Sequence, residues 1–170
     1  MLHEVEVQAI DPSRLETLIG PDRAARFEAA AAAARSLLEG RRVVNVNSTA
    51  TGGGVAELLQ TLLAYVRGVG VDARWVVIEG DAEFFEVTKR LHNHLYGSRG
   101  DGGPLGPEEH SRYLRTMHEN AGELLSFIRP DDVVILHDPQ TAGLTASVHT
   151  AAARVVWLWP PYCAGHIFSL

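Results

Sequence analysis

Short apolar runs alternate with longer amphipathic segments along most of this 170-residue chain. The runs Val43–Val46 and Ala73–Ile78 are too short for helices and are typical of buried strands. Between them, leucines recur with the helical period over Val55–Arg67, which predicts a helix connecting the two strands. The first half of the chain therefore predicts a strand–helix–strand unit.

The second half continues this alternation. Asp81 is a plausible cap for one helix, and Pro107 suits the first turn of a long helix that reaches about Ile128. The apolar runs Asp132–Leu136 and Arg154–Leu158 predict a third and a fourth strand, separated by a short helix that runs to about residue 152. Strands that alternate with helices predict an α/β fold with a Rossmann-like, doubly wound parallel sheet covered on both faces.

Residues 1–40 precede this pattern and predict a helical amino-terminal extension. Asp11 is a plausible helix cap, Pro21 begins a second helix, and Gly40 ends it. The alanine run Ala29–Ala34 lies inside the second helix and favours helix rather than disorder. The predicted Rossmann-like unit then covers 41–158, followed by an atypical tail over 159–170.

A glycine-rich segment follows the first predicted strand. Asn47 and Ser48 lead into Gly52, Gly53 and Gly54, immediately before the first connecting helix. Glycine allows a ligand to approach the backbone, and the first N–H groups of a helix lack partners, so this segment suits a phosphate, a carboxylate or a sugar hydroxyl. The Walker and dinucleotide-binding glycine patterns are both absent. The alternative is a tight turn whose glycines serve only helix–sheet packing.

A second polar segment, His137–Gln140, follows the third predicted strand. In a doubly wound sheet the first and third strands are neighbours at the switch point, so we expect the two segments to face one another over one crevice. His137 and Asp138 suit acid–base chemistry or the orientation of sugar hydroxyls. The alternatives are a histidine that caps the strand end, an Asp138 that caps a helix beginning at Pro139, and a solvated Gln140.

Composition argues against some classes of binding partner. A net charge of −6 and a pI near 5.7 argue against nucleic acid or an anionic membrane as the main partner. Cys163 is the only cysteine, and we expect a cytoplasmic protein without an intrachain disulfide, a secretory signal or a membrane span. His92 and His94 point away from each other on a helix and do not form a zinc pair, so no metal site is expected.

Several phrases then occur together in a fixed order. They are Val46–Ala50, Gly52–Glu57, Arg74–Asp81, Glu83–Phe85, Val87–Lys89, His92-Asn93 and His137–Gln140. Over about residues 1–157 this pattern closely resembles the amino-terminal half of the trehalose glycosyltransferring synthases. These are retaining glycosyltransferases of the two-domain GT-B architecture that join nucleotide-activated glucose to free glucose.

The resemblance implies the acceptor side of such an enzyme. It implies that the glycine loop approaches the diphosphate of the donor, which is a nucleotide-activated glucose, with no further cofactor. The implied catalytic residues are Asp138 and His137. The implied substrate-binding residues are Asn47, Ser48, Gly52, Gly53, Gly54, Gln140 and Lys89, although Lys89 alone reads as a solvated charge.

The tail departs from the family pattern, because Pro160 and Pro161 follow Trp159 where a segment of the Arg-Cys-His type is expected. The family's carboxyl-terminal domain, which holds most of the sugar-nucleotide site, is missing from this sequence. We therefore expect the isolated chain to be inactive. The alternatives are a non-catalytic sugar- or nucleotide-binding remnant, which exposed surface would incline to self-associate, and a structural domain with a plain glycine turn.

Overall fold

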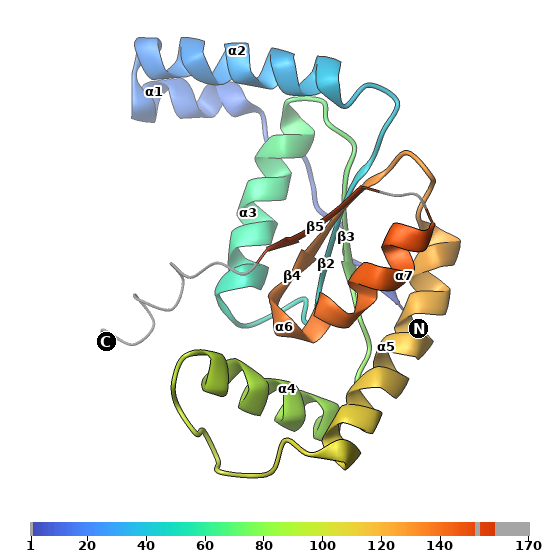
Figure 1. Ribbon diagram of the computed structural model, residues 1–170. Helices are drawn as coiled ribbons and strands as arrows, with labels where there is room; N and C mark the ends of the chain where they lie inside the picture. The colour runs from blue at the N-terminus through green and yellow to red at the C-terminus, as the bar shows by residue number, and fades with distance from the viewer. Residues whose placement is uncertain (1, 152–153, 159–170) are drawn as a thin grey trace.

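The computed structural model describes residues 2–151 and 154–158 and forms one sheet with helices around it (Figure 1). The predicted tail, Cys163 and the expected helix end at residue 152 lie outside the described residues. The strands are β1 (His3–Glu4), β2 (Val43–Asn47), β3 (Ala73–Val77), β4 (Val133–His137) and β5 (Arg154–Leu158). The helices are η1 (Pro12–Leu15), α1 (Glu16–Ile19), α2 (Pro21–Leu37), α3 (Gly54–Gly68), α4 (Ala82–Leu95), α5 (Pro107–Phe127), α6 (Asp138–Thr141), η2 (Ala142–Leu144) and α7 (Thr145–Thr150).

The strand order is β1-β3-β2-β4-β5, and β2 to β5 run parallel. The four predicted strands are all present, and the prediction that the first and third are neighbours is confirmed by the pairing of β2 with β4. The prediction of an entirely helical extension was wrong for His3–Glu4, which forms β1 antiparallel to the edge of β3. The pairing continues beyond β1, since the N–H of Val5 donates to the carbonyl oxygen of Trp75 at 2.8 Å.

Side chains alternate between the two faces of the sheet because successive strand residues point in opposite directions. On one face, Val44, Val46, Val134 and Leu136 are fully buried in the core that also includes residues of α5 and α7. On the other face, Trp75 packs with residues of α3. Figure 1 shows α3 on one side of the sheet and α5 with α7 on the other. This arrangement confirms the α/β prediction.

Local sequence signals set the helix starts. The carboxylate of Asp81 accepts from the N–H of Phe84 at 2.7 Å and caps α4, as predicted. Pro107 is the first residue of α5, and the carboxylate of Glu109 accepts from the N–H of Gly106 at 2.8 Å. These caps fix α4, which lies beyond the carboxyl ends of the strands in Figure 1.

The amino-terminal helices stand apart from the strands' carboxyl ends. In Figure 1, α1 and α2 lie side by side at the far end of the molecule from α4. Of the residues of α2, Ala31 alone is buried, so this helix adds little to the core. No helix in the described part of the chain is long and apolar enough to cross a membrane.

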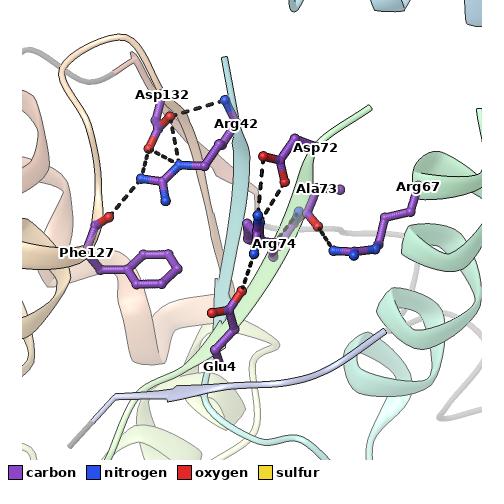
Figure 2. Close-up of polar contacts among 9 residues, drawn as sticks. Glu4, Arg42, Arg67, Asp72, Ala73, Arg74, Phe127 and Asp132 are labelled. Atoms are coloured by element: carbon purple, nitrogen blue, oxygen red, sulfur yellow. Dashed lines mark hydrogen bonds and ion pairs between the residues drawn. The ribbon is translucent and has the colours of Figure 1, made fainter. Parts of the chain in front are cut away.

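A buried ion pair ties the amino ends of β2 and β4 together (Figure 2). Arg42 donates to Asp132 from Nη2 at 2.6 Å and from Nε at 3.0 Å, and its Nη2 also donates to the carbonyl oxygen of Phe127 at 2.8 Å. Only 10% of the Arg42 side chain and 2% of the Asp132 side chain are exposed. The sheet therefore contains a charge pair that neither strand signals by its apolar pattern.

Candidate functional site

The two polar segments singled out in the sequence lie at one edge of the sheet. The glycine segment follows β2, and His137–Gln140 closes β4 and opens α6. Because β2 and β4 are adjacent and parallel, their carboxyl ends share this edge. The pairing brings both segments to the position where α/β proteins bind ligands.

The glycine segment adopts a conformation that requires glycine. Gly52 and Gly53 have φ of 74° and 88°, in the region that other residues avoid. Gly53 is the N-cap of α3 and provides no side-chain cap, so the first N–H groups of this 15-residue helix have no capping partner. A Cβ atom added at Gly52, Gly53 or Gly54 would meet nothing within 4 Å. The loop is open enough for a ligand to reach these N–H groups.

Asn47 supports this loop from below. The residue is 2% exposed, its Nδ2 donates to the carbonyl oxygen of Thr49 at 2.7 Å, and its Oδ1 accepts from Trp75 Nε1 at 2.7 Å. The hydroxyl of Thr49 in turn donates to the carbonyl oxygen of Thr51 at 2.6 Å. In this structure Asn47 shapes the loop, and its predicted contact with sugar stays a prediction.

His137 is buried and neutral. Its Nε2 lies 3.0 Å from Oδ1 of Asn45, whose Nδ2 donates to the carbonyl oxygen of Arg74. An amide oxygen only accepts, so Nε2 carries the proton and Nδ1 is left as an acceptor. Burial lowers the pKa of His137 to about 4. At neutral pH the imidazole therefore acts as a hydrogen-bonding group without charge.

Asp138 has an unusual backbone. Its φ is 65°, the one positive value among the described residues other than glycine. The predicted role as a helix cap was wrong, because Asp138 is the first residue of α6 and His137 is its N-cap. The proline that follows restricts its ψ, and the turn into α6 sets its φ. Strained residues of this kind gather at functional sites.

The surroundings of Asp138 fix its backbone and leave its carboxyl group available. Nε1 of Trp157 donates to its carbonyl oxygen at 3.0 Å. Burial raises the pKa of Asp138, and the charge of His92 acts in the opposite direction. The carboxyl oxygens accept no hydrogen bond from a described residue. His92 and Trp157 were not among the predicted site residues. His92 was considered as a metal ligand and as part of the family pattern, without a role at Asp138.

Tyr113 of α5 holds the segment that follows Asp138. The hydroxyl of Tyr113 donates to the carbonyl oxygen of Pro139 at 3.0 Å and accepts from the N–H of Gly143 at 2.8 Å. Oε1 of Gln140 is buried and has no described hydrogen-bond partner. Lys89 is exposed on α4 and lies in none of these contacts. Gln140 thus has an acceptor oxygen without a described partner two positions after Asp138, whereas Lys89 contacts neither residue through a described hydrogen bond.

A cavity of about 830 Å³ opens at the carboxyl ends of β2 and β3. Its walls come from Ser48–Ala50, Val77–Asp81, Phe85 and residues of α5. Of the predicted site residues, Ser48 lines it. The ionisable side chains in its walls are four carboxylates and one guanidinium, namely Glu79, Asp81, Glu119, Glu123 and Arg115. One of these carboxylates, Asp81, is paired with Arg112 at 3.1 Å.

The described residues contain no group of three or more His, Cys, Asp or Glu side chains that could hold a metal ion. The chemistry available at this edge is that of an open helix amino terminus, a neutral imidazole and a partly buried carboxyl group. These are groups suited to binding hydroxyls and a phosphate.

Residues 45–163 match the family model described as trehalose synthase, N-terminal domain. The chain belongs to this family. It is 38% identical over 164 residues to the trehalose synthase of Pyrococcus horikoshii, a match that covers 94% of this chain and 36% of that protein. It is 43% identical over 122 residues to the trehalose synthase of Thermococcus litoralis, covering 72% of this chain and 28% of the relative.

This trehalose synthase domain therefore spans about a third of the length of the curated relatives it matches. Its fold is similar to that of an α,α-trehalose-phosphate synthase (UDP-forming) from Burkholderia xenovorans, solved in complex with glucose-6-phosphate. That likeness has a TM-score of 0.50 at 17% identity and covers 69% of this chain and 33% of the solved chain. This likeness confirms the prediction of a Rossmann-like GT-B lobe. At this level of identity it shows the fold and not the reaction.

Proposed function

We propose that this chain forms the acceptor-side lobe of a trehalose-forming glucosyltransferase. The full reaction would transfer glucose from a nucleotide-activated donor to free glucose and release a nucleoside diphosphate. The observation that carries the proposal is Asp138, which has a φ of 65° and a carboxyl group without a hydrogen bond from a described residue, at the edge of the sheet shared with the glycine loop. Membership of the trehalose synthase family supplies the reaction class.

In the proposed reaction each segment has a separate task. The open N–H groups at Gly53, Gly54 and the start of α3 would stabilise the negative charge that develops on the departing diphosphate. Asp138 would accept a hydrogen bond from the acceptor hydroxyl. This hydroxyl would attack the anomeric carbon of the donor glucose from the face that the diphosphate leaves. Neutral His137, with Asn47 and Ser48 beside it, would orient the sugar hydroxyls, and Gln140 would add its unused oxygen.

We infer that the acceptor is free glucose rather than glucose 6-phosphate. The resemblance to the trehalose glycosyltransferring synthases, which join the donor to free glucose, supports this acceptor. The structure solved in complex with glucose-6-phosphate is that of a trehalose-phosphate synthase.

The donor would be held mainly by a second lobe, which the curated relatives are long enough to contain. A cytoplasmic location belongs to the same proposal and rests on the single cysteine. Transfer by this chain would therefore require a partner lobe that grips the nucleotide.

One observation favours a second candidate function. On the α3 side of the molecule Leu58 and Leu62 are 52% and 47% exposed, and Val156 and Leu158 of β5 are 44% and 43% exposed. Apolar side chains exposed together favour association. The alternative is a sugar- or nucleotide-binding remnant without turnover that self-associates through this surface.

Trehalose formation from glucose and UDP- or ADP-glucose separates the two functions. The purified chain would be assayed alone and mixed with the separately produced carboxyl-terminal part of the Pyrococcus horikoshii synthase. The proposal predicts trehalose only in the mixture, with glucose as acceptor and not with glucose 6-phosphate. A folded chain that binds glucose but stays inactive in the mixture would favour the remnant.

A further inference from the structure

A second cavity lies at the opposite edge of the sheet, where the amino ends of β2 and β3 meet the end of α2. Its volume is about 390 Å³. Three segments separate in sequence form its walls: the end of α2 with the loop into β2, the turn from α3 to β3, and the loop that follows α5. They contribute Arg35, Leu38, Glu39, Gly40, Arg41, Arg42, Gly70, Val71, Asp72 and Arg129.

Part of the positive charge at this edge is used by the fold itself (Figure 2). Arg42 is neutralised by Asp132. Arg74, outside the cavity, pairs with Asp72 at 2.6 Å and with Glu4 at 3.2 Å. The charges of Arg42 and Asp72 in the cavity wall are therefore already balanced by neighbours.

Three arginines of the wall remain. Arg35 donates from Nη1 to the carbonyl oxygen of Val69 at 2.9 Å, which satisfies the carboxyl end of α3. The guanidinium groups of Arg41 and Arg129 make no hydrogen bond or ion pair with a described residue. Glu39 is the one carboxylate of the wall without a partner among the described residues, so three guanidiniums face one carboxylate.

This surplus is notable in a chain of net charge −6. Helix carboxyl ends attract cations, and Arg35 meets that requirement. Arg41 and Arg129 come from the loop into β2 and from beyond the end of α5, and they still line the same cavity. No hydrogen bond between described residues explains why the guanidinium groups of Arg41 and Arg129 lie at this cavity.

We propose that this cavity binds a small multivalent phosphate, with a diphosphate group held between Arg41 and Arg129 and contacted by Arg35. Guanidinium groups bind phosphate oxygens through paired hydrogen bonds. Charges arriving from three segments match an anion with several charged oxygens better than a single carboxylate. A volume near the lower end of small-molecule sites requires a compact ligand.

Binding there has a structural consequence. The ligand would connect α2, through Arg35, with the sheet and the end of α5. Because it binds the folded chain, it would also raise the melting temperature by mass action. The site lies at the edge opposite Asp138 and does not depend on the proposed glycosyl transfer.

Isothermal titration of the full chain tests the site with three probes at constant ionic strength: pyrophosphate, UDP and orthophosphate. The critical variant is Arg41→Gln/Arg129→Gln, and the control of equal charge is Arg23→Gln/Arg26→Gln, exposed on α2 outside the cavity. We expect saturable pyrophosphate binding that weakens roughly tenfold or more in the first variant and not in the control. If UDP binds and its binding is weakened by Arg41→Gln/Arg129→Gln, a nucleotide is a source of the diphosphate. If UDP does not bind, the ligand is free diphosphate.

Two results would overturn the site. One is pyrophosphate that neither binds nor raises the melting temperature of the wild-type chain. The other is equal weakening in both double variants, which would show general charge attraction. Circular dichroism without ligand verifies folding, and Arg41→Lys, which keeps the charge but lacks the paired donors, should weaken binding to an intermediate degree.

Discussion

Asp138 combines backbone strain with a carboxyl group that the fold does not use. Glycine is tolerated at its φ of 65°, whereas alanine is not. We predict that Asp138→Gly unfolds with a free energy about 1 kcal/mol higher than that of Asp138→Ala, measured by urea denaturation. Equal stabilities would show that the conformation imposes no strain.

The buried imidazole of His137 makes stability depend on pH. Its pKa is about 4 in the folded chain and near 6.5 when exposed, so below pH 6.5 the unfolded state binds the extra proton. The free energy of unfolding should therefore fall by up to about 1.4 kcal/mol per pH unit from pH 6.5 toward pH 4. His137→Gln should flatten this window in denaturation curves, and an unchanged slope would contradict a neutral buried His137.

The sequence did not reveal which charged residues form ion pairs. Arg42 and Asp132 stand 90 positions apart and meet only because β2 pairs with β4. Arg90 likewise meets a carboxylate, that of Asp101, which no sequence pattern signals. It is 9% exposed and donates to Asp101 and to the carbonyl oxygen of Pro104.

The Arg42–Asp132 pair gives a prediction of direction. Burial alone would raise the pKa of Asp132, but hydrogen bonds from Arg42 and from the N–H groups of Arg129 and Arg42 hold it below its ordinary value. We predict that Arg42→Leu lowers the free energy of unfolding at pH 7 by about 3 kcal/mol. A depressed carboxyl pKa stabilises the fold fully above the unfolded value, near 3.8, and this stabilisation is lost as the pH falls from there through the lower folded pKa. The difference between wild type and variant should therefore shrink below about pH 3.8. A loss that is independent of pH would contradict the pair.

The loop between α4 and α5 depends on Arg90. Asp101 accepts from its Nε at 2.7 Å and from its Nη2 at 2.9 Å, and Pro104 accepts from its Nη1 at 2.6 Å. We predict that Arg90→Met exposes the loop and speeds tryptic cleavage after Arg99 severalfold over wild type. Asp101→Asn should show a smaller increase, and cleavage at the wild-type rate in both variants would show that the loop does not need the clamp.

Elements were predicted well where pattern alone decides them. The apolar runs located β2 to β5, and Asp81 and Pro107 marked helix starts that the structure confirms. Strand β1 was missed because two residues carry no period, and its formation depends on the free edge of β3. The turn at Asp138 was missed because proline there suggested an ordinary cap, whereas the structure begins the helix one residue earlier. The prediction of the site's place came from topology, and the roles of its residues remain predictions.

The proposed function treats the whole chain as one of two lobes. The chain covers 36% of the Pyrococcus horikoshii synthase, and the carboxyl edge of its sheet presents a glycine loop, a cavity and Asp138. Its exposed apolar side chains on α3 and β5 are available for a partner. Function at this scale should therefore appear only when two lobes meet.

The most direct measurement uses a chimera in which residues 1–158 replace the matching part of the Pyrococcus horikoshii synthase. Trehalose formation from glucose and nucleotide-activated glucose would be compared for this chimera and for its Asp138→Asn variant, with folding verified by thermal melting. We predict an active chimera and a loss of at least about a hundredfold in the variant, since Asn keeps the backbone conformation and removes the charge. An Asp138→Asn chimera as active as its parent would contradict a catalytic role of Asp138.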